Sequence, residues 1–311
     1  MKLSIVSTLY KSSPYIVEFY QRAGAAAHKL VGEEYEIILV NDGSPDNSLN
    51  IALDLQEKDS KLTIIDLSRN FGHHKAVMTG LQYAHGDYVF LIDSDLEEDP
   101  ELVNLFWDDL KKSPDIDLIY GIQKKRKGYL FERMSGSLII KITNALSEIK
   151  MSENVIMARL MTHRYVKNLL LYTEREMVFN GLTTLTGYKQ KGFPITKRHK
   201  GSTTYSLTHK INLALNYITS LSSYPLIFIF YVGLIIISFS LFFLLWIIYK
   251  SIFYQTAMGW ASVAASIWLF GGIIIFFLGV IGIYLSKIFI EVKGRPLSII
   301  KDIYVKKEKQ E

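Results

Sequence analysis

The sequence predicts an α/β protein in which a mostly parallel sheet is followed by membrane-associated helices. Two observations predict this class. Short, continuously apolar segments alternate with helical segments along the first 120 residues, which is typical of a parallel sheet with helices on both faces. Near the C-terminus, two apolar runs of about 20 residues or more are each long enough to cross a bilayer as a helix. The 311 residues can therefore form one full α/β domain and a membrane hairpin.

The strands predicted in the first part of the chain are short, and a helix follows each of the first four. Ser12-Ser13-Pro14 is typical of a helix start, and Asn41-Asp42-Gly43-Ser44-Pro45 is a strong turn and helix-entry signal. In chain order, we expect strands at 3–8, 36–40, 62–67, 88–92 and 116–120, and helices at 14–30, 46–58, 75–84 and 99–111.

From residue 128 onwards the alternation is looser. A stripe of apolar residues at spacings of four predicts an amphipathic helix at 129–146. Two interpretations stay open for this helix, packing on the core and lying on the membrane surface. The remaining segments before the apolar runs are predicted as helices at 163–172, 174–186 and 207–221, and as a basic loop or strand at 188–200.

The two apolar runs, at 225–248 and 264–285, are the predicted membrane spans. Core helices of a soluble protein are the alternative, which the absence of charge and the flanking aromatic residues disfavour. Basic residues precede the first span and follow the second, so the positive-inside rule places both termini in the cytoplasm. No signal-peptide pattern is present at the N-terminus. We therefore expect a multi-pass protein of the inner (plasma) membrane whose large N-terminal domain is cytoplasmic.

These features divide the chain into six expected segments. They are a cytosolic domain at 1–206, an amphipathic juxtamembrane helix at 207–223, spans at 224–249 and 264–286, a short outside loop at 250–263, and a cytosolic tail at 287–311.

The formal net charge of +5 does not indicate a nucleic-acid partner. Many basic residues flank the spans or form the run at 124–127, where membrane lipid headgroups or phosphates are the expected partners. A solvated charge run is the alternative for that segment. The chain has no cysteine, which excludes disulfides and thiolate chemistry.

Acidic residues follow the strand predicted at 88–92. Asp93 and Asp95 leave this buried strand at a spacing of two, and Glu97 can reach the same cation. Neighbouring carboxylates repel each other, and Mg²⁺ or Mn²⁺ favours such oxygens, particularly where a diphosphate supplies further ligands. We predict that Asp95 holds the metal and that Asp93 shares the metal shell or a ribose. A lone D-x-D is a weak signal, but its place at a strand end strengthens it.

The acidic residues further along this segment have a different predicted role. Glu98, Asp99 and Glu101 surround Pro100, and acidic residues suit the positive end of a helix. We therefore expect these three to favour the start of the helix predicted at 99–111.

Asp42 and Gly43 follow the strand predicted at 36–40. A carboxylate there can accept hydrogen bonds from a base N–H or from ribose hydroxyls, and Gly43 permits a close backbone approach. An Asx-turn or helix cap is the alternative. Ligands of parallel sheets bind beyond the carboxyl ends of the strands. Asp42 is therefore expected to converge with Asp93 and Asp95, although about 50 residues separate them in the sequence.

A polar segment, residues 69–75, follows the strand predicted at 62–67. Arg69 or Lys75 can neutralise the charge of a diphosphate. His73 and His74 invite interpretation as metal ligands or a base, which we disfavour because adjacent side chains diverge and no third ligand lies close in sequence.

Together these segments resemble family-2 glycosyltransferases with the GT-A fold, especially the membrane-anchored branch of dolichol-phosphate mannose synthases and bactoprenol glucosyltransferases. The resemblance covers nearly the whole chain, including the hairpin and residues 291–296 after it. The matching segments are Val40-Asn41-Asp42-Gly43-Ser44, Leu67-Ser68-Arg69-Asn70-Phe71-Gly72, Gly80-Leu81 with Ala84-x-Gly86-Asp87, and Asp93-x-Asp95-Leu96.

The resemblance implies a nucleotide-sugar donor, with UDP favoured, and an inverting transfer that uses Mg²⁺ or Mn²⁺. It implies that Asp42 contacts the nucleotide, that Asp93 and Asp95 hold nucleotide and metal, and that Arg126 and Arg133 meet donor or acceptor phosphates. The expected acceptor is a polyprenyl phosphate, whose oxygen is already ionised. A lipid-linked saccharide in cell-surface polysaccharide synthesis is the rival, and a catalytically silent membrane scaffold is a weaker one. A homo-oligomer stays open.

A sugar hydroxyl acceptor would need a carboxylate base, for which Glu97, Glu98 and Asp99 are the candidates. Three departures from the family pattern bear on the site. Its Leu-Gln-Asp is Leu96-Glu97-Glu98 here, an aspartate of its Gly-Asp-Phe-Arg-Leu stretch is Met157, and a lysine near the membrane is Thr204. By resemblance, the last two positions belong to the acceptor side.

Overall fold

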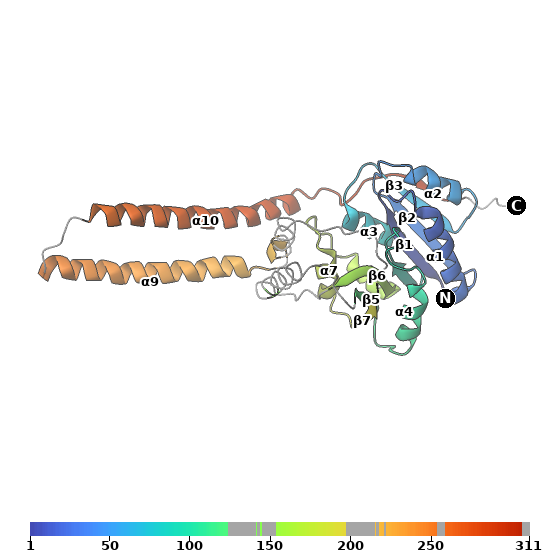
Figure 1. Cartoon of the computed structure of the whole chain (residues 1–311), viewed down its shortest axis with the longest axis horizontal. Coiled ribbons are helices and arrows are strands. Elements are labelled where there is room, and N and C mark those ends of the chain that lie inside the picture. Colours follow the sequence, from blue (N-terminus) through green and yellow to red (C-terminus); the bar gives the residue numbers. More distant parts are fainter. Residues whose placement is uncertain are drawn as a thin grey trace.

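An α/β domain lies at one end of the molecule, and two long helices extend from it (Figure 1). The computed structural model describes residues 1–123, 141, 144, 154–196, 215, 218–220, 222–253 and 259–306. The helices predicted at 129–146 and 207–221 lie almost wholly outside the described residues. Arg126, Arg133 and Thr204 also lie outside them.

The domain is built on one eight-stranded sheet with the strand order β7-β5-β6-β4-β1-β2-β3-β8. Strands β1 to β4 are parallel neighbours, and only β6 and β8 run antiparallel to the strands beside them among the described residues. This confirms the predicted mostly parallel sheet. The strands are β1 (Leu3–Leu9), β2 (Tyr35–Asn41), β3 (Leu62–Leu67), β4 (Tyr88–Leu91), β5 (Leu118–Gln123), β6 (Val155–Thr162), β7 (Gln190–Ile195) and β8 (Ile300–Tyr304).

Helices cover both faces of the sheet, because each strand of the parallel part is apolar on both sides. The helices α1, α2 and α4 contribute to one buried apolar cluster, and α3, α6 and α7 contribute to a second. Every residue of β1 is buried between the two. The helices are α1 (Ile16–Val31), α2 (Ser48–Gln56), α3 (His73–Gln82), α4 (Leu102–Lys111), α6 (His163–Leu169) and α7 (Phe179–Leu185).

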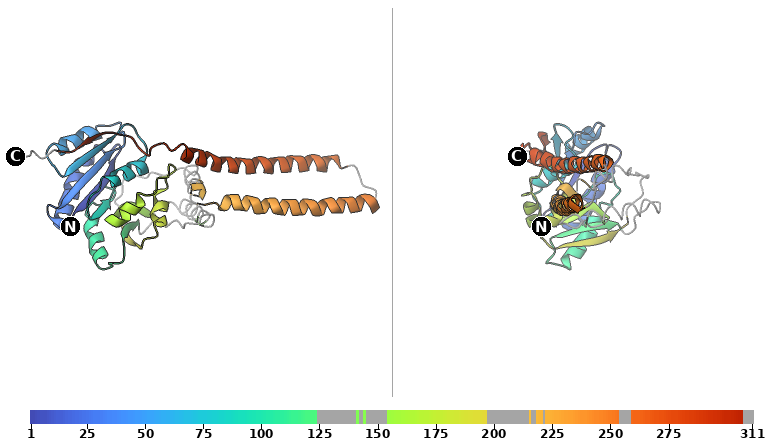
Figure 2. Two further views of the ribbon diagram at one scale, coloured as in Figure 1. Left: turned by 180° about the vertical axis from the view of Figure 1, so that it is seen from behind. Right: turned by 90° about the vertical axis from the view of Figure 1, so that its left-hand side faces the viewer.

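Two strands were not predicted from the sequence. β6 lies between β4 and β5 and is antiparallel to both. β8 pairs antiparallel with β3 at the sheet edge, so the segment expected to be a tail returns to the domain (Figure 2). Two side-chain contacts hold this return: the hydroxyls of Thr79 and Ser298 lie 2.6 Å apart, and Lys301 Nζ lies 3.6 Å from a carboxylate oxygen of Asp66.

The two long helices, α9 (Tyr224–Phe253) and α10 (Trp260–Val292), lie side by side in both views (Figures 1 and 2). One described segment, Leu269–Val292, is long and apolar enough to cross a membrane, with a hydropathy of 2.5. A second apolar helical stretch, Tyr224–Gly233, is shorter. One described helix is therefore a candidate span by length and composition, and the hairpin of two spans stays a prediction.

The end of α10 is fastened to the domain. The carboxylate of Glu291 accepts hydrogen bonds from the main-chain N–H groups of Arg175, at 2.6 Å, and Glu176, at 3.2 Å. Nε of Arg175 donates in turn to the main-chain carbonyl of Arg295 at 2.6 Å. The apolar helix is thus joined to the loop before α7 by polar contacts as well as by the chain itself.

Candidate active site

The carboxyl ends of β1, β2, β3 and β4 lie at one edge of the sheet. The register pairs Leu9 with Asn41 and Asn41 with Asp66. β4 pairs with β1 on the other side, and the strand order therefore reverses around β1. Sheets of this kind bind ligands at such a reversal, outside the carboxyl ends of the strands. The segments after β2, β3 and β4 carry the predicted site residues at this edge.

Ser94 fixes the turn that carries the two aspartates. Its side chain is buried, and its hydroxyl donates to the main-chain carbonyl of Thr8 at 2.8 Å and lies 3.0 Å from the Ser12 hydroxyl. Asp93 and Asp95 on either side are only partly buried. Oδ1 of Asp95 accepts the N–H of Glu97 at 3.0 Å. The turn thus sends its serine inward and leaves both aspartates accessible.

The backbone of this turn is strained at Leu96, whose φ is +59°. A side chain other than glycine's is uncommon in this left-handed region. The Leu96 side chain packs against the buried cluster beside α1 and α4, which holds the residue in place. The contacts of Ser94 and Leu96 therefore impose the path of the loop that carries Asp93, Asp95 and Glu97.

His73, at the start of α3, was not assigned to the site from the sequence. Its Nε2 lies 3.5 Å from Oδ1 of Asp93, and its Nδ1 lies 3.1 Å from the Thr8 hydroxyl. Burial lowers the pKa of His73 below its usual 6.5, which favours the neutral ring at neutral pH. His74 points elsewhere, toward the carbonyl of Met177 and the ring of Phe179. The two histidines thus contact different partners, although their ring centres lie only 5.6 Å apart.

The acidic oxygens at this edge suit a cation that is shared with a substrate. In the described part of the chain, no group of three or more His, Asp or Glu side chains is arranged around a metal position. Mg²⁺ commonly binds one or two protein carboxylates and takes its other ligands from phosphates and water. Asp93 and Asp95 fit this kind of site because both carry hard oxygens beside the strand ends.

Asp42 binds the neighbouring loop. Its side chain is 2% exposed, and its carboxylate accepts the N–H groups of Phe71 at 2.7 Å and Gly72 at 3.1 Å. Burial raises the pKa of Asp42 above its usual value, and these hydrogen bonds oppose the rise. Asp42 therefore binds main-chain N–H groups, as in the alternative interpretation of an Asx-turn or helix cap. The N–H groups belong to the loop after β3 and not to the segment that follows Asp42. A direct contact with a nucleotide stays a prediction.

Gly43 permits the close approach of this loop. Its φ is +58°, and a Cβ atom there would lie 2.4 Å from the main-chain nitrogen of Asn70. The close backbone approach predicted for Gly43 is therefore made with residues 69 and 70. Arg69 itself is exposed, and its guanidinium lies 4.1 Å from the centre of the Phe71 ring. Lys75 lies in the first turn of α3, close to the same edge.

Glu98 does not serve the start of α4, which contradicts its predicted role. Its side chain is 2% exposed, and the carboxylate accepts the N–H of Ala158 at 2.8 Å and, more weakly, that of Met157 at 3.4 Å. Because both donors lie on β6, Glu98 ties the loop after β4 to that strand. Asp99 and Glu101 instead accept hydrogen bonds from Arg22 on α1.

A buried arginine lies beside Glu98. Arg159 is 1% exposed and donates to the carbonyls of Ile156 and Met157 and to the Asn180 side chain. Its guanidinium also lies 4.7 Å from the centre of the Phe179 ring. Burial lowers the pKa of Arg159 to about 10, so the group stays charged at neutral pH. Its positive charge favours the ionised forms of nearby Glu98 and Asp93.

The comparisons with known proteins identify the family. Residues 4–170 match the model of glycosyl transferase family 2. The chain is 45% identical to a Mycobacterium tuberculosis protein described as a putative glycosyltransferase, over 98% of this chain and 89% of that protein. It is 32% identical to a prophage bactoprenol glucosyl transferase homolog of Escherichia coli, over 97% and 99% of the two chains.

A Shigella phage SfII bactoprenol glucosyl transferase is also 32% identical, over 97% of this chain and 98% of that protein. Among solved structures, Staphylococcus aureus TarS 1-349 in complex with UDP-GlcNAc is similar with a TM-score of 0.47 and 19% identity, over 71% of this chain and 66% of that one. The matched family model and the identities over nearly the full length lead to one conclusion: the chain belongs to glycosyl transferase family 2 and is a glycosyltransferase.

Proposed function

We propose that the protein transfers a sugar from a nucleotide diphosphate to a polyprenyl phosphate at the cytoplasmic face of the membrane, with inversion at the anomeric carbon. The observation that carries the proposal is the Asp93-Ser94-Asp95 turn at the carboxyl ends of β1 and β4. Support for the acceptor comes from the relatives named bactoprenol glucosyl transferase, which align over 97% of this chain, long helices included.

The donor side uses residues from three loops. Asp93 and Asp95 would hold Mg²⁺ or Mn²⁺, which would stabilise the charge of the leaving diphosphate as a Lewis acid, and Glu97 would reach the same cation when the donor is bound. Arg69 and Lys75 supply positive charge at the same edge. The resemblance adds Arg126 and Arg133 as phosphate contacts and favours a UDP-sugar as donor.

Asp42 and Gly43 act on the donor side by shaping the loop at residues 69–72. The Asp42 carboxylate holds the main-chain N–H groups of that loop, and Gly43 lets it approach β2. In this role they position Arg69 and the start of α3, where His73 meets Asp93.

The state of the nearby carboxylates favours a phosphate acceptor. A polyprenyl phosphate oxygen is already ionised and can attack the anomeric carbon directly, while the bond to the nucleotide diphosphate oxygen breaks and the nucleotide diphosphate leaves. A sugar hydroxyl would first have to lose a proton to a base. Of the three candidate bases, Glu98 is buried against β6 and Asp99 is paired with Arg22. Glu97 is the remaining candidate base.

The membrane part of the proposal rests on the apolar segment Leu269–Val292 and on the bactoprenol glucosyl transferase relatives that align over nearly the whole chain. A lipid acceptor stays in the bilayer, so the transfer site must lie at the membrane surface. We propose a multi-pass topology in the plasma membrane with the catalytic domain and both termini in the cytoplasm, as the distribution of basic residues predicts.

The test is a transfer assay with the purified full-length protein in lipid vesicles. Radiolabelled nucleotide sugars and Mg²⁺ or Mn²⁺ are supplied with either a polyprenyl phosphate or a lipid-linked saccharide, and label in the lipid extract is counted. We expect label with the polyprenyl phosphate, and loss of it in Asp95→Ala. Asp109→Asn is the matched control, because Asp109 lies on α4 and pairs with Lys191. Equal labelling by Asp95→Ala would refute the metal role, and label only on the saccharide would refute the acceptor.

A further inference from the structure

The loop that carries the two aspartates is fixed at more points than a surface loop requires. We call residues 93–101 the acidic loop. Its N-terminal part is held by Ser94 on the carbonyl of Thr8, and its middle by Glu98 on the N–H groups of β6. The end of the loop, at Asp99 and Glu101, is contacted by the side chain of Arg22.

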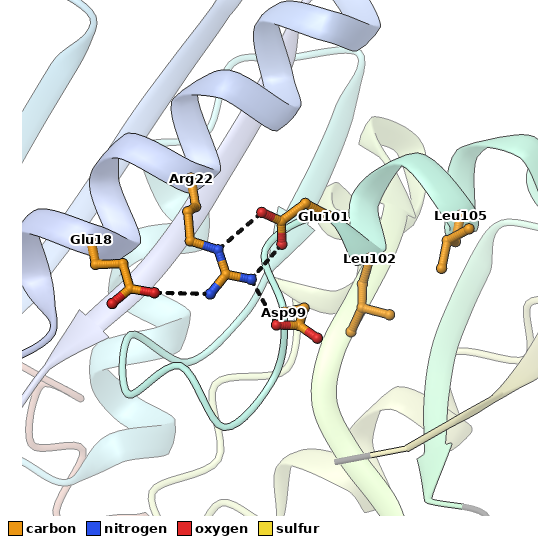
Figure 3. Close-up of a pocket in the computed structure, with 6 residues that line it drawn as sticks. All are labelled: Glu18, Arg22, Asp99, Glu101, Leu102 and Leu105. Carbon is orange, nitrogen blue, oxygen red and sulfur yellow. Dashed lines mark hydrogen bonds and ion pairs between the residues drawn. The ribbon is translucent and has the colours of Figure 1, made fainter. Parts of the chain in front are cut away.

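Arg22 contacts three carboxylates from two directions (Figure 3). Its Nη2 donates to Oδ1 of Asp99 and to Oε2 of Glu101, each at 2.7 Å, and its Nε donates to Oε1 of Glu101 at 2.9 Å. Its Nη1 donates to Glu18, one turn earlier on α1, at 3.1 Å. The guanidinium therefore binds the Glu101 carboxylate through two parallel hydrogen bonds and also binds Asp99.

The helix that carries Arg22 is a rigid support. α1 buries Phe19 and Ala23 in the apolar cluster that it shares with β1 and α4. Arg22 itself lies at the edge of this contact, with a side chain 19% exposed. A guanidinium group on a well-packed helix can fix the position of a loop, because the side chain that carries it has little conformational freedom.

We propose that Arg22 is a positioning residue of the transfer site: it anchors the acidic loop so that Asp93 and Asp95 keep the spacing that the metal-bound donor requires. This inference rests on the proposed function for its consequence, although the anchoring itself does not. Without Arg22, Asp99 and Glu101 would repel each other across the start of α4, and the loop would lose its only charged anchor to α1 among the described residues.

Arg22 is suited to this role in a way that a lysine is not. The planar guanidinium of Arg22 donates four hydrogen bonds in fixed directions. The ammonium group of a lysine is a compact charge on a flexible side chain and does not fix these directions. Arg22→Lys therefore keeps the charge and removes the geometry. Arg22→Met removes both and retains the apolar stem that packs along α1.

The first measurement is hydrogen exchange of the metal-free, full-length protein in lipid vesicles. We expect the N–H groups of residues 96–99 and 101 to exchange faster in Arg22→Lys and faster still in Arg22→Met, with β1 and β2 unchanged. The matched control is Arg164→Lys, because Arg164 also makes a two-bond contact with one carboxylate, that of Asp117. Unchanged exchange of residues 96–99 and 101 in Arg22→Met would overturn the anchoring role.

The second measurement is binding of Mn²⁺ in the presence of UDP, followed by the spectrum of the Mn²⁺ ion, together with the KM for the donor. Residues that orient metal ligands typically change affinity by about tenfold or more. We expect a weakening of about that size in Arg22→Met, a smaller one in Arg22→Lys, and none in Arg164→Lys. Faster loop exchange with unchanged Mn²⁺ affinity would restrict Arg22 to a structural role and refute the proposal.

The two proposals fail in different ways. If the wild-type protein neither binds Mn²⁺ with UDP nor transfers label, the proposed function is wrong whatever the Arg22 variants do. If the wild-type protein does both and the Arg22 variants match it, only the positioning role is wrong.

Discussion

The hydroxyl of Ser94 donates to the main-chain carbonyl of Thr8 at 2.8 Å and so joins the turn after β4 to the end of β1. The two residues are far apart in the chain, yet this contact decides which way the aspartates of the turn face. His73 reaches the side chain of the same Thr8 and the carboxylate of Asp93. Thr8 is thus the common support of the aspartate turn and of its histidine neighbour.

Replacing Ser94 by alanine should weaken the site more than the fold. The change leaves the buried Thr8 carbonyl without its donor, which costs about 1–3 kcal/mol of unfolding free energy. Because the turn carries Asp93 and Asp95, we also expect a higher KM for the donor. Denaturant unfolding and transfer kinetics measure the two effects. Ser113→Ala, in the loop after α4, is the control, and an unchanged KM in Ser94→Ala would contradict the positioning of the turn.

Replacing Gly43 by alanine should be far more damaging than a comparable change elsewhere. Gly187 also has a positive φ, of +71°, but has no atom within 4 Å of an added Cβ. Gly187→Ala should therefore lower the unfolding free energy only by the cost of a non-glycine residue at positive φ, about 1–2 kcal/mol. Gly43→Ala adds a clash with the chain at Asn70, so its cost should be clearly larger. Equal losses of unfolding free energy in the two variants would show that the loop can move away.

The neighbours Glu97 and Glu98 should respond in opposite ways to the same substitution. Glu98→Gln places an amide against two N–H donors of β6, and it should lower the unfolding free energy by about 1–3 kcal/mol. Glu97→Gln should leave stability nearly unchanged and reduce transfer, because Glu97 is proposed to share the metal. Paired unfolding and activity measurements separate the two. A stable but inactive Glu98→Gln would reverse the assignment.

The acid sensitivity of the fold should depend on Glu36. Burial opposes ionisation of this carboxyl, but hydrogen bonds from Ser4, from the His85 N–H and from Lys2 lower its pKa below the usual 4.5. A depressed pKa contributes stability that is present above pH 4.5 and is lost as the pH falls through the lower, folded-state pKa.

Glu36→Gln should therefore reduce stability at neutral pH and flatten its dependence on pH below 4.5. Unfolding curves of both proteins between pH 3 and pH 7 measure this. Glu57→Gln, at the exposed C-terminal end of α2, is the control. Parallel pH profiles for wild type and Glu36→Gln would assign the acid sensitivity to other groups.

The first four strands and their helices could be predicted because their signal is local. β3 has the predicted bounds of 62–67, and the other three differ by one or two residues at their ends. β6 was missed because Arg159, a fully buried charge, interrupts its apolar run. β8 was missed because it follows a predicted membrane span, and its middle residues are exposed at the sheet edge.

The site could be predicted in outline for a similar reason. Asp93 and Asp95 follow an apolar strand, and parallel strands bring such ends together. The contacts that define the site join residues far apart in the sequence, such as Glu98 with Ala158 and His73 with Asp93. The periodicity of apolar residues in the sequence carries no information about these pairs. The sequence therefore predicted one shared role for Glu98 and Asp99 at the start of a helix, although Glu98 binds β6 and Asp99 binds Arg22.

The pairing of β8 with β3 has a consequence for the order of events during synthesis. β3 is made early, but its partner strand is translated only after α9 and α10. Until then, the edge of β3 has unpaired N–H and C=O groups, which can pair with other chains. The sheet can thus be completed only after the apolar helices have left the ribosome, so that under the proposed topology the closing of this edge is coupled to membrane insertion of the same polypeptide.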